Sequence, residues 1–95
     1  MPQNTTIECA PRVWTLLTNN DVDALRAANL GSEAIWLQGT VGTTPPTSAA
    51  GGLPLLPGQI LPASALLVDV FPGVAGVNRV YALTQVATRV SVSHA

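Results

Sequence analysis

Glycine and proline interrupt every long apolar stretch of this chain, and no other feature constrains its fold as strongly. From residue 34 to residue 68 no side chain is charged, a length that could otherwise suggest a membrane segment. The interruptions are Pro45, Pro46, Gly51, Gly52, Pro54, Pro57, Gly58 and Pro62. No continuous apolar segment of the roughly 20 residues that a transmembrane helix needs is left. The sequence therefore predicts short elements joined by turns, and no membrane association.

Between the turn residues lie short runs rich in Val, Leu, Ile, Thr and aromatic residues, a pattern typical of an all-β sandwich or barrel. The predicted strands are 12–17, 34–41, 66–71, 79–83 and 89–94. Loops with little or no charge are expected at 43–52 and 73–78. At 95 residues the chain is long enough for one modest core. We expect residues 1–95 to form a single domain, a small β-sandwich or jelly-roll-like barrel with long Gly/Pro-rich loops.

Strict alternation marks two of these runs as half-buried strands. In the last run Val90, Val92 and His94 share one face, and the residues between them share the other. In the second run Ile35 and Leu37 lie on the face opposite Trp36. We expect the runs 79–83 and 89–94 to pair as a terminal hairpin across the 84–88 connection.

The segment 21–30 is ambiguous between helix and strand. Its alanines and Leu25 favour a helix that Asn20 or Asp21 would cap and Gly31 would close. Ten residues make only a marginal helix, however, and residues 29–32 before the next strand are typical of a hairpin turn. A strand is the favoured interpretation.

Residues that carry chemistry are few, since Cys9 is the only cysteine and His94 the only histidine. Neither an intrachain disulfide nor a thiolate metal site can form. A Ser-His-Asp catalyst is not favoured, because Ser91 and Ser93 lie on the other face of the strand from His94 and no Gly-x-Ser-x-Gly turn is present. We expect a structural histidine, no catalytic residue, no metal and no cofactor, and predict that the protein is not an enzyme.

The charged residues give little sign of a ligand. Four arginines, no lysine and five acidic residues lack the dense cationic footprint of a nucleic-acid-binding protein. Clustered oxygen ligands occur at Asn19, Asn20, Asp21 and Asp23. An EF-hand register that starts at Asp21 lacks an oxygen ligand at Leu25, a glycine at Arg26 and an acid at Ser32, which leaves a polar turn as the expectation and another kind of calcium site as an alternative. Asp69 should face outward or, if buried, pair with Arg79 or Arg89.

Two tryptophans stand out in a chain with four aromatic residues. Trp14 and Trp36 are expected as core anchors, with an oligomer or docking interface as the alternative, because Trp is enriched among the residues that dominate interface energetics. The uncharged 43–52 loop, with Pro45 and Pro46, is predicted to lie against another protein, with a mobile surface loop as the alternative. The candidate interface residues are Trp14, Trp36, Pro45, Pro46 and Phe71.

Several segments together carry a family resemblance. They are 14–17 (WTLL), 34–40 (AIWLQGT), 44–46 (TPP), 52–55 (GLPL), 71–74 (FPGV) and 90–95 (VSVSHA). The chain resembles a group of short proteins of tailed bacteriophages and prophages that are encoded among virion genes. The resemblance spans nearly the whole chain, favours a strand over 21–29, and brings no catalytic residues with it.

This resemblance implies a structural virion protein, made in the host bacterial cytoplasm, as the absence of a secretory signal at residues 1–6 also suggests. The favoured role is a capsid decoration or cement protein that contacts the major capsid protein or other virion proteins. Sparse charge leaves apolar surface to cover, for which a homo-oligomer, expected to be a trimer, is one solution. The alternatives are a tail, neck or fibre-attachment component and a small glycan- or calcium-binding module.

Overall fold

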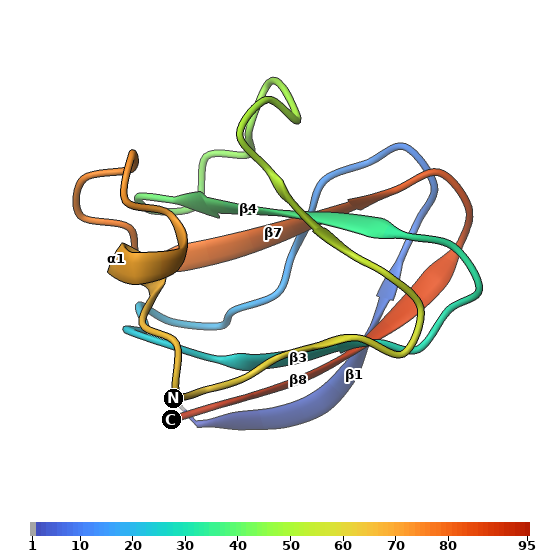
Figure 1. The fold of residues 1–95 in the computed structure, drawn as a ribbon, viewed down its shortest axis with the longest axis horizontal. Coiled ribbons are helices and arrows are strands. Elements are labelled where there is room, and N and C mark those ends of the chain that lie inside the picture. The colour runs from blue at the N-terminus through green and yellow to red at the C-terminus, as the bar shows by residue number, and fades with distance from the viewer. Residues whose placement is uncertain (1) are drawn as a thin grey trace.

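Two four-stranded antiparallel sheets pack face to face in the computed structural model, which describes residues 2–95 (Figure 1). Sheet A has the strand order β1-β8-β3-β6, and sheet B has the order β2-β7-β4-β5. The elements are β1 (Gln3–Cys9), β2 (Thr15–Leu16), β3 (Arg26–Asn29), β4 (Ile35–Thr40), β5 (Leu53–Leu55), β6 (Ile60–Leu61), α1 (Leu67–Val70), β7 (Arg79–Thr84) and β8 (Thr88–His94). This small β-sandwich, with one short helix, confirms the predicted all-β fold class.

The core lies between the sheets, where alternate residues of each strand point inward. In β8 the side chains of Val90, Val92 and His94 are buried, and the residues between them are half-buried or exposed. In β4 the buried side chains include Ile35 and Leu37. Both predicted alternations are therefore confirmed. The largest fully buried apolar side chains are Leu17, Leu25, Ile35, Leu37, Leu67, Val80, Val90 and Val92.

The predicted terminal hairpin is wrong, because β7 and β8 belong to different sheets. β7 pairs with β2 and β4, whereas β8 pairs with β1 and β3. The 85–87 connection crosses from one sheet to the other, so the inward side chains of the two strands meet across the core instead of lying side by side. Val80 and Ala82 of β7 are both fully buried in that position. A hairpin of two strands has no second sheet to bury these two side chains, so they would have stayed exposed.

The segment 21–30 does contain a strand, β3, which confirms the favoured interpretation. The hairpin turn expected after it is wrong, since β3 lies in sheet A and β4 in sheet B. The buried side chain of Asn29 holds the crossing in place. Its Nδ2 donates hydrogen bonds to the carbonyl oxygens of Glu33 (2.8 Å) and Leu55 (2.9 Å), and its Oδ1 accepts one from the N–H of Gly31 (2.9 Å).

The run 66–71 was predicted as a strand, but it forms the single helical turn α1. A strand would have placed Asp69 on the same face as Leu67 and Phe71, and therefore in the core. One helical turn buries Leu67 and Phe71 and leaves Asp69 exposed. The Asp69 carboxylate therefore faces outward, which is the first of the two arrangements predicted for it.

One strand of sheet A, β1, was not predicted from the sequence. β1 pairs with β8 over seven consecutive residues, from Gln3 opposite His94 to Cys9 opposite Thr88. This pairing places the two ends of the described chain side by side (Figure 1).

Of the predicted strand 12–17 only β2 forms, because Arg12 adopts a positive φ of 61° in a turn. No helix within residues 2–95 has the length and apolar character to cross a membrane.

Candidate protein-interaction surface

The outer face of sheet B carries large apolar side chains where a sandwich commonly presents polar ones. Trp36 lies opposite Leu83 on one neighbouring strand and opposite Pro54 on the other. Leu16 lies opposite Tyr81 on the same side of the sheet. Because the residues of β4 on either side of Trp36 point into the core, its indole points outward, where it is 37% exposed. We refer to Leu16, Trp36, Pro54, Tyr81 and Leu83 as the Trp36 face.

Tyr81 anchors this surface although it points away from the core. It is only 3% exposed, and Leu16 and Gln38 lie opposite it on the two neighbouring strands. Its hydroxyl donates a 2.6 Å hydrogen bond to the carbonyl oxygen of Thr43. A buried tyrosine normally has such a partner for its polar tip. The bond ties the start of the 43–52 loop to the Trp36 face.

The 43–52 loop therefore belongs to the same side of the molecule, where it projects from the end of β4 (Figure 1). Pro45 is exposed and Pro46 is half-buried. At its far end the loop returns to the sheet through Gly52, where a Cβ would come 2.9 Å from the carbonyl oxygen of Ala49 and 3.3 Å from that of Leu37. Glycine at position 52 thus allows the loop to turn tightly against β4.

The outer face of sheet A is different in character. Apart from Ala28, its outward positions on β1, β8 and β3 carry hydroxyl, amide and charged side chains, namely Asn4, Thr6, Glu8, Arg26, Arg89, Ser91 and Ser93. Exposed apolar side chains appear only toward the β6 margin, at Leu30 and Ile60. The two faces of the sandwich are therefore chemically distinct, and the Trp36 face is the one suited to apolar contacts.

The predicted interface residues fall in three places. Trp36, Pro45 and Pro46 lie on or beside the Trp36 face, and Trp14 is half-buried immediately before β2 of the same sheet. Neither tryptophan belongs to the core, so the expectation that both anchor it is wrong. Phe71 is 4% exposed within the core and adds nothing to this surface.

Tyr81 and Leu83 were not predicted as members of this surface. A signal for them exists in the run 80–83, which is apolar on both of its faces. When both faces of a strand are apolar, either both are buried within the protein or one of them is exposed and available to bind a partner. The inward residues of this strand, Val80 and Ala82, meet the core, so Tyr81 and Leu83 mark the second face.

The acidic cluster at 19–23 is a structural turn in this fold. Nε of Arg79 donates to Oδ1 of Asp21 at 2.9 Å, and Nδ2 of Asn20 donates to the carbonyl oxygen of Asp21 at 2.9 Å. This is the one ion pair within 4.0 Å in the range 2–95, and it engages Arg79, one of the two arginines predicted as partners of a buried Asp69. In the same range no three His, Cys, Asp or Glu side chains are grouped so that they could hold a metal ion.

Cys9 and His94 are both buried on the core side of sheet A. Burial raises the pKa of the Cys9 thiol above its ordinary value of 9.0, and a side-chain hydrogen bond with Thr15 offsets part of this effect. Thr15 belongs to sheet B, so the contact joins the two sheets. Nδ1 of His94 lies 2.9 Å from the backbone oxygen of Ala95, and its Nε2 is buried without a hydrogen-bond partner in the described chain.

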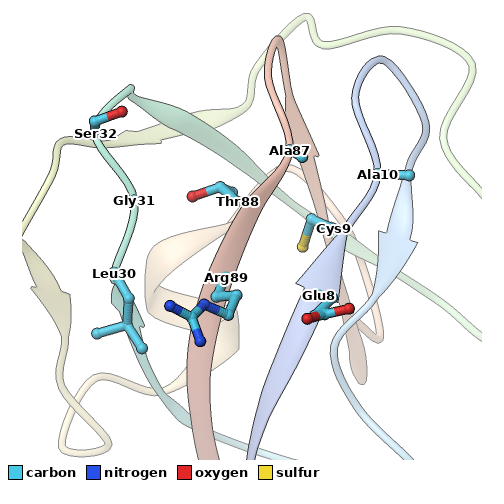
Figure 2. A pocket seen from close by; sticks show the side chains of 9 residues that line it. All are labelled: Glu8, Cys9, Ala10, Leu30, Gly31, Ser32, Ala87, Thr88 and Arg89. Carbon is cyan, nitrogen blue, oxygen red and sulfur yellow. The ribbon is translucent and has the colours of Figure 1, made fainter.

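An open hollow of about 600 Å³ lies at the loop end of sheet A (Figure 2). Glu8 and Arg89 line it from neighbouring strands, with Leu30 beyond Arg89 (Figure 2). Although Glu8 and Arg89 are directly opposite in the register, their side chains form no ion pair within 4.0 Å in this part of the molecule. The remaining lining residues are Cys9, Ala10, Gly31, Ser32, Ala87 and Thr88. The hollow has charged walls but no convergent set of catalytic groups.

Comparison of the chain with protein-family models, curated proteins and solved structures finds no match. The distinctive surface features are the Trp36 face, the adjoining 43–52 loop and the polar outer face of sheet A. Of these, the Trp36 face combines exposed aromatic area with a rigid sheet beneath it, an arrangement suited to binding another protein.

Proposed function

We propose that this protein is a structural component of a tailed-bacteriophage virion that decorates the capsid and stabilises it through protein–protein contacts. The observation that supports this role is the Trp36 face, an apolar surface built on β-strands in a chain with very few charges. The proposed partners are the major capsid protein or other virion proteins, and the phage assignment itself rests on the resemblance of the sequence.

The mechanism is burial of the Trp36 face and the 43–52 loop against neighbouring capsid subunits. Trp36 supplies the anchor, because a partly exposed tryptophan at the centre of an interface contributes more binding energy than most other residues. The surrounding Leu83 and Pro54 exclude water from it. Rigid strands lose little conformational entropy on binding, which favours a permanent contact over a transient one.

The size of the molecule fits such a contact. A stable interface buries about 800 Å² on each partner. The surface of this molecule is 5014 Å², so the contact would use about one-sixth of it.

Quantitative mass spectrometry of purified particles from the source tests the proposal directly. A lattice decoration protein should be present in copies on the order of hundreds per virion. Roughly three to a few dozen copies would replace this role with a tail, neck or fibre-attachment position. Absence from particles would overturn a structural virion role, and a small glycan- or calcium-binding module would become the leading alternative.

A pair of variants tests whether the Trp36 face makes the contact. Trp36→Ala should weaken rebinding to stripped particles about 30-fold or more, since a central tryptophan anchor contributes about 2 kcal/mol. Ile60→Ala, which truncates an exposed apolar side chain of sheet A, is the matched control and should bind within about threefold of the parent. Equal loss in both variants would show that the Trp36 face is not the binding surface.

A further inference from the structure

β1 is a long edge strand that lacks most of the features that normally protect a sheet edge. Sheet edges are commonly blunted by short strands, proline, charged side chains (lysine above all) or bulges, and of these β1 has only the charge of Glu8. The other three edge strands follow this rule, since β2 and β6 have two residues each and β5 has three with Pro54 among them. β1 has seven residues, contains no proline or lysine, and pairs with β8 in an unbroken register.

The hydrogen-bonding direction of β1 follows from that of β8. The N–H of Leu30 donates to the carbonyl oxygen of Arg89, so Arg89 directs its backbone groups toward β3. Successive residues of an antiparallel strand direct these groups to opposite sides. Val90 and Val92 therefore bond to β1, through their partners Ile7 and Thr5.

The N–H and C=O groups of Asn4, Thr6 and Glu8 consequently point to the free edge of the sheet. Within the described residues 2–95, no backbone hydrogen bond outside the β1–β8 pairing involves any residue of 3–9. The side chains of Asn4, Thr6 and Glu8 are exposed. The free edge thus offers three consecutive donor–acceptor pairs at the spacing of an antiparallel strand.

The sequence of β1 is complementary to itself in one antiparallel register. When Thr6 lies opposite Thr6 of a second copy, Asn4 of each copy lies opposite Glu8 of the other. All three free-edge residues then exchange backbone hydrogen bonds, and each carboxylate meets an amide N–H donor instead of a like charge. If the two strands shift by two residues from this register, one of Asn4, Thr6 and Glu8 no longer lies opposite another of the three.

The core side of β1 is incompletely covered in the monomer. Thr5 lies opposite the buried Val92 and yet is exposed, and Ile7 packs against the core while only partly buried. In the self-complementary register, Thr5 of each copy lies opposite Ile7 of the other. A second copy would therefore shield the part of the core that the sandwich leaves open at this edge.

We propose that two copies of this chain associate through β1, in antiparallel register about Thr6, to join their A sheets into one continuous eight-stranded sheet. This interface is two-fold symmetric, which gives an oligomer of two where the sequence analysis expected three. It is independent of the virion role, because it requires only the chain itself. The Trp36 face lies on sheet B and remains free in the dimer.

Charge variants at position 4 test the register. Asn4→Glu would place a carboxylate opposite that of Glu8 in two symmetric positions, and it should weaken the dimer at least about tenfold. Asn4→Lys would place an ammonium group there, and it should tighten the dimer. Gln85→Glu and Gln85→Lys, in the exposed 85–87 turn, change the net charge equally and should leave the dissociation constant unchanged. Sedimentation velocity of the purified chain over a range of concentrations measures all five proteins.

Amide hydrogen exchange provides a readout at single-residue resolution. The N–H groups of Gln3, Thr5, Ile7 and Cys9 bond to β8 and should be protected at every concentration. Those of Asn4, Thr6 and Glu8 should become protected only as the dimer forms. Thr6→Pro removes an N–H that β8 does not use, so it should abolish the dimer and leave the protection of the odd-numbered residues in place.

Three results would overturn the proposal. The first is a chain that stays monomeric up to millimolar concentration. The second is a dimer or trimer to which Asn4→Glu, Asn4→Lys and Thr6→Pro make no difference, because its interface would lie elsewhere. The third is association that leaves the amides of Asn4, Thr6 and Glu8 as exchangeable as they are in the dilute protein.

Discussion

The ring of Phe71 packs directly on the backbone of Gly39, on the core side of the sheet whose outer side carries Trp36. A Cβ added to Gly39 would come 2.7 Å from Cδ2 of Phe71 and 2.6 Å from Cγ2 of Val77. The absence of a side chain at position 39 is therefore what allows the segment after α1 to cover this end of the core.

Gly39→Ala is expected to destabilise the fold by about 1–3 kcal/mol, because both neighbouring side chains are themselves packed in the core and must shift. Urea unfolding followed by tryptophan fluorescence measures the change. Gly73→Ala is the control, since a Cβ at Gly73 meets nothing within 4 Å, and its effect should stay within about 0.5 kcal/mol. Equal stability of the two variants would contradict the described packing.

Asn29→Ala should be among the most destabilising single substitutions, with an expected loss of about 2–4 kcal/mol. It removes three hydrogen bonds of a buried side chain at once and leaves the carbonyl oxygens of Glu33 and Leu55 with one partner fewer. Chemical unfolding provides the free energy, with Gln85→Ala in an exposed turn as the control. A loss below about 1 kcal/mol would mean that water replaces these bonds.

Tyr81→Phe should loosen the 43–52 loop while the sandwich stays folded. The substitution deletes only the hydrogen bond to the carbonyl oxygen of Thr43, which is expected to lower the unfolding free energy by about 0.5–1.5 kcal/mol. Limited proteolysis should then cut the loop faster than in the parent, with all other sites unchanged. Unaltered cleavage would show that the loop is held by other contacts.

The stability of the fold should decline at alkaline pH through Cys9. Its pKa is raised in the folded state, so the unfolded chain loses the thiol proton first as the pH rises. This contribution to stability is complete below the pKa of Cys9 in the unfolded chain. It is lost as the pH rises from about 8 toward the pKa of Cys9 in the folded protein, and the free energy of unfolding falls by up to about 1.4 kcal/mol per pH unit. Urea unfolding of the parent and of Cys9→Ala from about pH 7 to 10 tests this. Parallel curves for the two proteins would refute it.

Calcium should leave the thermal unfolding temperature unchanged, because Arg79 already engages the carboxylate of Asp21. Asp21→Asn should lower the unfolding free energy by at most about 0.5 kcal/mol, since the Asp21 side chain is 69% exposed and solvent screens the pair. Differential scanning calorimetry with calcium and with a chelator checks both statements. An upward shift that calcium causes and Asp21→Asn removes would revive the calcium-site alternative.

Alternation in the sequence predicted the faces of β4 and β8 correctly, because side-chain direction in a strand depends only on local geometry. Which strands would pair could not be read in the same way. The chain crosses between sheets after Asn29 and after Thr84, and short connections of this kind look like hairpin turns in sequence. The run 66–71 was misassigned for a related reason, since only the exposure of Asp69 distinguishes a helical turn from a strand there.

The candidate surface was predicted only in part. Trp36 and the 43–52 loop were identified from composition, whereas Tyr81 and Leu83 require knowledge of which face of β7 meets the core. Phe71 was predicted to lie at an interface, whereas the structure buries it in the core. Its burial depends on the gap left by Gly39, a long-range relationship that no local pattern contains.

The pairing of β1 with β8 also governs the order in which the molecule can form. β1 is the first strand of the described chain to leave the ribosome, and its one neighbour in sheet A is the last. Residues 3–9 therefore stay unpaired along both edges until residues 88–94 have been synthesised. Closing the sheet brings together segments separated by nearly the whole sequence, and folds dominated by such distant pairings complete in milliseconds to seconds. The interval before β8 arrives is when a newly made chain is most exposed to pairing with the wrong neighbour.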